Sequence, residues 1–272
     1  MSESEKPTMA LLPSLIGRIR EQRPLVHHIT NMVVMNDTAN ITLAIGASPV
    51  MAHAREEVEE MVKFAGALVL NIGTLTPEQI EAMLLAGKRA NELGIPIVLD
   101  PVGAGATKLR TESALRLLRE LSITVLRGNA SEIGTLVGVA AETRGVDAVS
   151  LGEDREVTAR RAAREFSTTV AITGASDVIT DGQRMAHVEN GYPLLASITG
   201  SGCMATSLVG AFLAVESDAW LATIAALVAM GRAGEIAAPK AGGPGTFRSH
   251  LLDAVAALSE EAFVQGQKVS VA

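Results

Sequence analysis

Short runs of apolar, β-branched residues alternate with longer stretches of helical periodicity, and this alternation limits the fold more than any other feature of the chain. The runs span residues 24–29, 48–51, 67–71, 96–100, 123–127 and 169–173. Because strands joined through crossover helices become parallel neighbours, the pattern predicts an α/β fold. The runs are almost wholly apolar, which indicates that helices cover both faces of the sheet. We therefore expect a three-layer sandwich around a mainly parallel central sheet.

The helical stretches and one tight turn also carry recognisable signals. Thr76 is a good N-cap residue, Pro77 suits the first helical position, and Gly94 is placed to end that helix. The Asp181-Gly182 pair favours a turn with positive φ, which predicts an antiparallel hairpin of residues 177–180 and 184–188 at an edge of the sheet. Other helices are expected over residues 111–121, 157–166, 203–215 and 220–234.

The charge balance and the single cysteine restrict the class of protein. The 272 residues include 23 Lys and Arg against 30 Asp and Glu, a net charge of −7, so no general affinity for nucleic acid or an anionic membrane is expected. Cys203 has no partner for an intramolecular disulfide, which favours a cytoplasmic setting. No repeat or linker divides the sequence, so we expect one domain over residues 13–272 after a loose tail over residues 1–12.

One uncharged segment, residues 190–215, raises the question of a membrane span. Gly191, Pro193 and the turn at residues 200–202 interrupt its apolar character. The segment is therefore expected to form a buried strand, a turn and a helix, and not to enter a membrane.

The Gly-rich turn over residues 198–206 is the first candidate functional element. Its glycines let backbone N–H groups approach an anion closely, and the helix that follows presents unpaired N–H donors and the positive end of its dipole. These features predict a phosphate-binding turn. An ordinary tight turn that leads into a buried helix explains the same residues, so the turn alone does not decide between the two.

Two further strand ends carry charged residues. Asp100 closes the run 96–100, where ligands bind in open parallel sheets, and its carboxylate suits a hydrated Mg²⁺; a turn aspartate bonded to nearby amides is the alternative. Arg127 ends another run and is a suitable partner for phosphates, although an exposed loop arginine is equally compatible. Asn129 and Glu132 have the spacing of a capping box, which accounts for both without a ligand.

Together, the Gly-rich turn and the two charged strand ends support a phosphate site more strongly than each does alone. Strand ends that share one edge would bring an anion-binding turn, a guanidinium and two carboxylates together, which are the parts of Mg²⁺-assisted phosphoryl transfer. The sequence has neither a Walker pattern nor a dinucleotide fingerprint, so P-loop and Rossmann sites lose support.

Methionine and histidine residues add little. Met32, Met35 and Met51 are candidates for lining an adaptable apolar pocket, although core packing is the commoner use of this residue. The five histidines show no ligand spacing and the chain has one cysteine, so a zinc site is not expected.

Four runs together resemble the hydroxyethylthiazole kinase family, whose members are ribokinase-like enzymes of thiamine biosynthesis and salvage. The runs are ITNMVVMNDTAN at residues 29–40, DPVG at 100–103, NASE at 129–132 and TGSGC at 199–203. The resemblance covers nearly everything from about Pro13 onward. It implies a ribokinase-like α/β sandwich, assembled as a homotrimer with substrate sites between subunits. The implied reaction uses ATP and Mg²⁺ to phosphorylate the primary hydroxyl of 4-methyl-5-(2-hydroxyethyl)thiazole.

The resemblance also implies roles for individual residues. Contacts to ATP are implied for Arg127 and Thr173, and water-mediated contacts to Mg²⁺ for Asp100 and Glu132. The residues implied for the thiazole pocket are Met51, Gly200, Asn31 and Met35.

Our mechanistic hypothesis places the catalytic residues on the Gly-rich turn. Backbone N–H groups of Gly200, Ser201, Gly202 and Cys203 would hold the moving phosphoryl group. Cys203 stands where ribokinase-like sugar kinases have an Asp base, and a thiol is the poorer base, although a helix N-terminus can lower its pKa. If the transition state is loose, positioning and charge neutralisation dominate, so the thiol would be a weak base or only a shape element.

Two other functions stay open at this point. Another ribokinase-like activity, such as a hydroxymethylpyrimidine kinase or a nucleotide-dependent hydrate dehydratase, would use the same scaffold. A non-catalytic binder of thiazole or nucleotide is the second, because the Asp base is absent. A panel of substrates offered with ATP separates the enzymes, and thiazole-dependent release of ADP excludes the binder.

Overall fold

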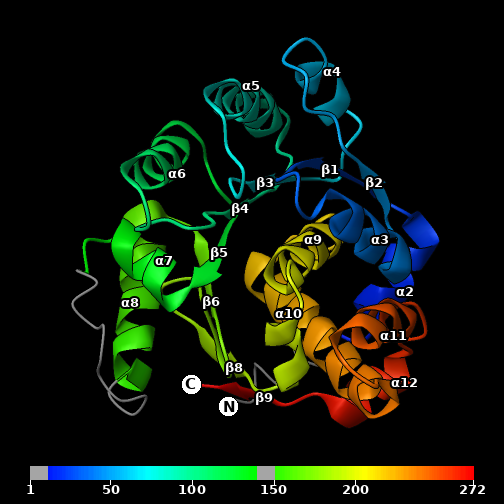
Figure 1. Ribbon diagram of the computed structural model, residues 1–272. Coiled ribbons are helices and arrows are strands. Elements are labelled where there is room, and N and C mark those ends of the chain that lie inside the picture. The colour runs from blue at the N-terminus through cyan, green and yellow to red at the C-terminus, as the bar shows by residue number, and fades with distance from the viewer. Residues whose placement is uncertain (1–11, 140–150) are drawn as a thin grey trace.

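A nine-stranded sheet forms the centre of the computed structural model, which describes residues 12–139 and 151–272 (Figure 1). Its strand order is β2-β1-β3-β4-β5-β6-β7-β8-β9, and the six strands from β2 to β6 are parallel. The parallel strands are β1 (Leu25–Ile29), β2 (Ser48–Val50), β3 (Ala67–Asn71), β4 (Ile97–Asp100), β5 (Val125–Asn129) and β6 (Thr169–Thr173). The antiparallel strands are β7 (Asp177–Thr180), β8 (Met185–Val188) and β9 (Val269–Val271).

Helices cover both faces of this sheet, which confirms the predicted three-layer α/β class (Figure 1). One layer contains α4 (Val58–Val62), α5 (Pro77–Leu93), α6 (Lys108–Glu120), α7 (Ala130–Leu136) and α8 (Leu151–Phe166). The other contains α2 (Ser14–Gln22), α3 (Met35–Ile45), α9 (Ser201–Leu213), α10 (Ala219–Ala237), α11 (Pro244–Ala256) and α12 (Glu260–Gly266). Two short 3₁₀ helices, η1 (Pro193–Ser197) and η2 (Ala238–Lys240), complete the described elements.

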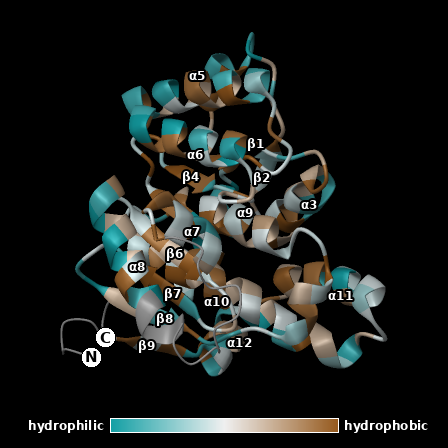
Figure 2. Ribbon diagram, turned by 60° about the vertical axis from the view of Figure 1, so that its left-hand side comes forward, coloured by the Kyte–Doolittle hydropathy of each residue, from teal (hydrophilic) through white to brown (hydrophobic). Residues whose placement is uncertain are grey.

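Alternate residues of each strand supply the two cores. Val69 and Val98 pack into the core beneath α9 and α10, whereas Leu70 and Leu99 pack into the core beneath α5 and α6. Successive side chains of a strand point to opposite faces, so an apolar run with no polar alternation fills both cores at once. Figure 2 shows the same arrangement, with mainly brown strands at the centre and teal residues along α5 and α6.

The longest apolar helix belongs to the core. Helices α10 and η2 form one continuous stretch, Ala219–Lys240, which is long and apolar enough to cross a membrane. In its most apolar window, however, 83% of the residues are buried inside the protein. Burial of this kind is typical of a central helix in a three-layer fold.

Several sequence predictions are confirmed and some are wrong. Strands β3, β6 and β7 have the predicted bounds, and α5 begins and ends at the predicted Thr76 and Gly94 caps. The hairpin of β7 and β8 is not at the edge, because β9 pairs with the outer side of β8. Only three residues long, β9 has too short a pattern to stand out in the sequence.

The prediction for the segment before α9 also needs correction. The segment that precedes α9 forms the 3₁₀ helix η1, not a buried strand, since Pro193 removes a donor that a strand ladder needs. Residues 1–11 of the predicted tail lie outside the described residues, whereas Leu12 is fully buried in the core.

Helix α9 can pack directly on the valines of β1 and β3 because Gly210 has no side chain. A Cβ at this position would lie 2.6 Å from Val69 Cγ2 and 3.3 Å from Val26 Cγ1. Both valines are buried strand residues, so neither can move without disturbing the core. Close packing at Gly210 therefore fixes the height of α9, whose first turn carries the Gly-rich sequence, above the strands.

We expect Gly210→Ala to lower the free energy of unfolding by about 1–3 kcal/mol, because overpacking against Val69 outweighs the better helix propensity of alanine. Gly245→Ala is the matched control, since Gly245 is also helical and a Cβ there would have no neighbour within 4 Å. Urea unfolding of both variants measures the difference. Equal stability of the two variants would contradict this account of the packing of α9.

Candidate functional site

The carboxyl ends of four adjacent parallel strands meet at one edge of the sheet. Asn71 ends β3 and pairs in register with Asp100, which ends β4. Asn129 ends β5 and pairs in register with Thr173, which ends β6. Parallel register therefore places polar side chains from four strands side by side, in the position where open α/β sheets bind ligands.

A buried polar network joins this edge to the start of α9. Asn71 Nδ2 donates to Asp100 Oδ2 at 3.0 Å and to Cys203 Sγ at 3.2 Å. Asn31 Nδ2 donates to Asn71 Oδ1 at 2.8 Å and lies 3.6 Å from the same sulfur. Thr206 Oγ1 donates to Asp100 Oδ2 at 2.8 Å. Residues that are far apart in the sequence thus surround Asp100 and the Cys203 thiol.

Arg127 connects Asp100 with the Gly-rich turn and with β6. Its Nη1 lies 3.7 Å from Asp100 Oδ2, and its Nη2 donates to Thr173 Oγ1 at 2.5 Å. A Cβ at Gly202 would lie 2.7 Å from Arg127 Nη1, so only glycine allows the guanidinium to approach the first turn of α9. Arg127 lies within β5, not at its end as predicted, and its side chain is only 12% exposed.

Glu132 lies next to this cluster and is held from two sides. Its Oε2 accepts from the Asn129 N–H at 2.8 Å, while Asn129 Oδ1 accepts from the Glu132 N–H at 2.9 Å, so the predicted capping box of α7 is present. The other oxygen, Oε1, accepts from the Gly103 N–H at 2.8 Å. The capping box and the loop after Asp100 therefore share one carboxylate.

The first turn of α9 presents backbone donors toward this cluster. Gly200 caps the helix with φ +82°, and a Cβ there would lie 2.6 Å from Val34 Cγ1. The N–H groups of Ser201, Gly202 and Cys203 are at the helix N-terminus, where no intrahelical acceptor exists. A left-handed glycine and a close neighbour together make glycine necessary at position 200.

The predicted pocket residues lie on two segments beside the network. The Asn31 side chain also accepts from the Val33 and Val34 N–H groups, at 3.1 and 3.2 Å. His53 links the segment that contains Met51 to the segment that contains Asn31. Its Nδ1 lies 3.2 Å from the Met51 carbonyl oxygen, and its Nε2 lies 3.1 Å from the Thr30 backbone nitrogen.

Met35 begins α3, and both Met35 and Met51 are half-buried. Their side chains would form the apolar part of a pocket beside Asn31.

Burial controls the ionisation of the central groups. Burial raises the pKa of Asp100 to about 6, and the nearby Arg127 offsets only part of this effect. Burial and the Asp100 charge raise the pKa of the Cys203 thiol to about 11. This direction is opposite to the lowering of the pKa that a helix N-terminus can give. At neutral pH the thiol is protonated.

The donor set is compatible with a hydrated divalent cation. Asp100 Oδ1 is buried and has no hydrogen-bond partner, and a carboxylate oxygen is the ligand that Mg²⁺ prefers. Within the described residues, no group of three or more His, Cys, Asp or Glu side chains forms a complete cage. A cation here would keep several waters and share its contacts with phosphate oxygens, as Mg²⁺ commonly does.

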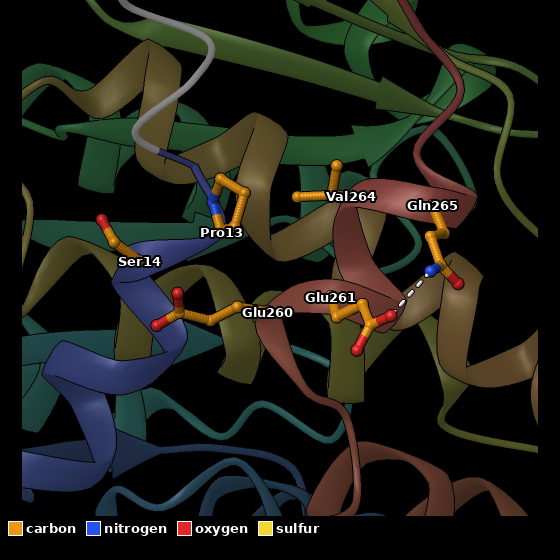
Figure 3. A pocket seen from close by; sticks show the side chains of 6 residues that line it. All are labelled: Pro13, Ser14, Glu260, Glu261, Val264 and Gln265. Atoms are coloured by element: carbon orange, nitrogen blue, oxygen red, sulfur yellow. Dashed lines mark hydrogen bonds between the residues drawn. The ribbon is translucent and has the colours of Figure 1, made fainter.

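Two surface hollows lie away from this cluster. One is between α2 and α12, and Figure 3 shows its lining and the 2.9 Å hydrogen bond from Gln265 to Glu261. The other is at the amino ends of the strands, next to Gly66, Pro96 and Thr124. Neither hollow includes a candidate residue.

Sequence reasoning missed two residues of the network, Asn71 and Thr206. Asn71 ends an apolar run just as Asp100 does, so the same strand-end argument applied to the run 67–71 would have found it. Thr206 lies one turn after Gly202 on α9, within the Gly-rich segment, but its partner Asp100 is distant in the sequence.

Solved structures of other proteins define the class of the fold. Pyridoxal kinase from Staphylococcus aureus in complex with AMP-PCP is similar, with a TM-score of 0.58 at 16% identity over 78% of this chain and 88% of that chain. The hydroxyethylthiazole kinase protein from Pyrococcus horikoshii is more similar, with a TM-score of 0.90 at 48% identity over 96% and 99% of the two chains. The fold is therefore ribokinase-like.

Sequence comparison identifies the family. The profile of the Hydroxyethylthiazole kinase family matches residues 16–261. The hydroxyethylthiazole kinase of Roseiflexus sp. is 55% identical over 263 residues, which are 97% of each chain. That of Chloroflexus aurantiacus is 56% identical over 259 residues, 95% of this chain and 96% of the relative. The chain belongs to the hydroxyethylthiazole kinase family, and it is a phosphotransferase.

The raised pKa of Asp100 predicts a specific dependence of stability on pH. Because the folded-state value is about 6 and the usual value is 3.8, the folded protein binds more protons than the unfolded chain between these values. The preferential protonation of Asp100 in the folded protein contributes up to about 3 kcal/mol to the free energy of unfolding. This contribution is complete below about pH 4 and is lost as the pH rises through 6.

We expect Asp100→Asn to abolish this contribution, so the free energy of unfolding should fall less between about pH 4.5 and 7 than in the unsubstituted protein. Asp177, whose pKa burial also raises to about 6, stays in both proteins and cancels in the comparison. Urea unfolding at several pH values measures the difference. The same pH dependence in both proteins would show that Asp100 is not buried as described.

Proposed function

We propose that this protein transfers the γ-phosphoryl group of ATP to the primary hydroxyl of 4-methyl-5-(2-hydroxyethyl)thiazole, with Mg²⁺. The observation that carries the proposal is the position of Arg127, which lies against both the Gly-rich first turn of α9 and the buried Asp100. An anion-binding helix N-terminus, a guanidinium and a carboxylate within one cluster suit phosphoryl transfer. Family membership supplies the substrate, because the relatives carry its name.

The chain's own residues would bind and orient the phosphates. Backbone N–H groups at Gly200, Ser201, Gly202 and Cys203 would donate to the transferring group, and Arg127 would balance its charge. Thr173, which already bonds Arg127, would hold that guanidinium and contact ATP. These donors are fixed before substrate arrives, so little reorganisation is needed at the moment of reaction.

Asp100 and Glu132 are the residues that would hold Mg²⁺, through water. When bound, the ion neutralises phosphate charge and orients the leaving group. The free Oδ1 of Asp100 and the 2.8 Å link from the Gly103 N–H to Glu132 support this assignment. Since the carboxyl of Asp100 must ionise for this role, its pKa of about 6 in the free protein places the acid limb of kcat/KM near that pH.

Cys203 would help to shape the site and would form weak hydrogen bonds, but it would not act as a strong base. Its raised pKa keeps the thiol protonated, and a loose transition state requires little proton removal before attack. Asn31 and Asn71 direct amide donors at the sulfur and would orient its S–H. The substrate hydroxyl would lie between the thiol and the first turn of α9, with Met51, Met35 and Gly200 near its ring.

The site would be completed by neighbouring copies of the chain in a homotrimer. Met32 and Val33 follow Asn31 directly and are 69% and 63% exposed, which is unusual for apolar residues beside a buried network. A second subunit that covers them would also close the thiazole pocket. We further propose that residues 13–272 form one kinase domain and that the protein acts in the cytoplasm.

We expect phosphorylated hydroxyethylthiazole and ADP after incubation of the protein with ATP, Mg²⁺ and the thiazole alcohol. Arg127→Ala should lower turnover by about 100-fold, because it removes a preorganised donor. Arg119→Ala, at an exposed position of α6, should leave turnover unchanged. Mass detection of the product measures both. Release of ADP with hydroxymethylpyrimidine but not with the thiazole, or tight binding without turnover, would favour the alternative functions.

Cys203→Asp should keep or raise turnover, since Asn31 and Asn71 would donate to the introduced carboxylate and a carboxylate is the better base at neutral pH. Cys203→Ser is the comparison, because it retains a small polar group without an improved base. Steady-state kinetics of both variants with saturating ATP measures the effect. Complete loss in both would instead assign a covalent or specific basic role to the thiol.

A further inference from the structure

Arg110 bonds the backbone of two loops at the candidate site. It lies in the first turn of α6, and its Nη1 donates to the carbonyl of Val102 at 2.7 Å and to that of Ile72 at 3.1 Å. Its Nη2 donates to the carbonyl of Gly73 at 2.7 Å. One guanidinium therefore joins the loop after β3 to the loop after β4, and the planar fork of arginine is the side chain that can reach three such acceptors.

Two of these carbonyls belong to peptide groups whose N–H donates a hydrogen bond to a side chain of the site, either Asn71 or Glu132. The Gly73 N–H donates to Asn71 Oδ1 at 3.0 Å, and the Gly103 N–H donates to Glu132 Oε1 at 2.8 Å. In each case Arg110 bonds the carbonyl of the same peptide group, which is the carbonyl of the preceding residue. Because a peptide group is planar, a fixed carbonyl also fixes the direction of its N–H.

The loop after β4 is shaped around this guanidinium. Gly103 has φ +77°, and a Cβ there would lie 2.9 Å from Arg110 Cδ and 3.2 Å from Nη1. A side chain at position 103 would therefore displace the fork. The arrangement is specific to Arg110, since Arg116 on the same helix instead pairs with the carboxylates of Glu81 and Glu120.

We propose that Arg110 is a positioning residue for phosphoryl transfer, which orients Asn71 and Glu132 through the two peptide groups that it bonds. The inference rests on the function proposed above. Loss of the fork would leave both peptide groups free to rotate, so Asn71 would hold Asp100 and Cys203 less well. Glu132 would lose its link to the loop that follows Asp100. Met51, Met35 and Gly200, which would contact the thiazole ring, lie on other segments, and Asn31 would be affected through its 2.8 Å hydrogen bond to Asn71 Oδ1.

The test compares Arg110→Met with Arg116→Met, which remove equal volumes and charges from one helix. We expect Arg110→Met to lower kcat by about 10- to 100-fold and to change KM for the thiazole less than about twofold. Hydrogen exchange at the Gly73 and Gly103 amides should accelerate about tenfold or more, because their acceptors are no longer aligned. Arg116→Met should leave kcat and both amides unchanged.

The outcomes separate this inference from the proposed function. Failure of the unsubstituted protein to phosphorylate the thiazole alcohol would overturn the proposed function itself. An active unsubstituted protein with unchanged kcat in Arg110→Met would overturn the positioning role alone. A fall in kcat that matches a fall in folded fraction, with unchanged exchange at both amides, would also overturn it. Circular dichroism of each variant supplies the folded fraction.

Discussion

Burial of the Asp100 carboxyl group is the constraint on which the site depends. A carboxylate removed from water is costly unless polar partners surround it, and here each partner comes from a different element. Asn71 approaches from β3, Thr206 from α9 and Arg127 from β5. These partners do not satisfy both carboxyl oxygens of Asp100, because Oδ1 has no hydrogen-bond partner in the described structure. One unsatisfied oxygen beside a guanidinium and a helix N-terminus is an arrangement that a bound cation and phosphate would complete.

Glycine makes the close approaches in this arrangement possible. Gly202 leaves room for Arg127, and Gly210 lets α9 settle onto the strands. Any side chain at either position would move the helix N-terminus away from Asp100. Core packing and the chemistry at the sheet edge are therefore linked through α9, and a change in how α9 packs on the strands would move the donors of its first turn.

Much of the fold follows from the sequence because its strongest signals are local. The apolar runs indicate the strands, and Thr76 and Gly94 mark the ends of α5. The spacing of Asn129 and Glu132 predicts the capping box of α7. The ends of parallel strands then directed attention to Asp100. Family resemblance supplied the substrate and the implied roles, which no local pattern contains.

What the sequence could not provide depends on contacts between distant segments. Arg110 bonds only backbone carbonyls, so no side-chain pattern marks its partners at residues 72, 73 and 102. The pKa of Cys203 depends on burial and on Asp100, which lies 103 positions earlier in the chain. Strand β9 exists because β8 offers it an edge, and three residues carry no period of their own.

The central claim is that one cluster, formed by Asp100, Arg127 and the first turn of α9, binds the phosphates. A crystal structure with Mg²⁺, a non-hydrolysable ATP analogue and the thiazole alcohol tests it most directly. The account predicts a terminal phosphate bonded to the Gly202 and Cys203 N–H groups and to Arg127, with the cation on the side of Asp100 Oδ1. Phosphates bound at the amino ends of the strands, with the Asp100 network unchanged and empty, would contradict it.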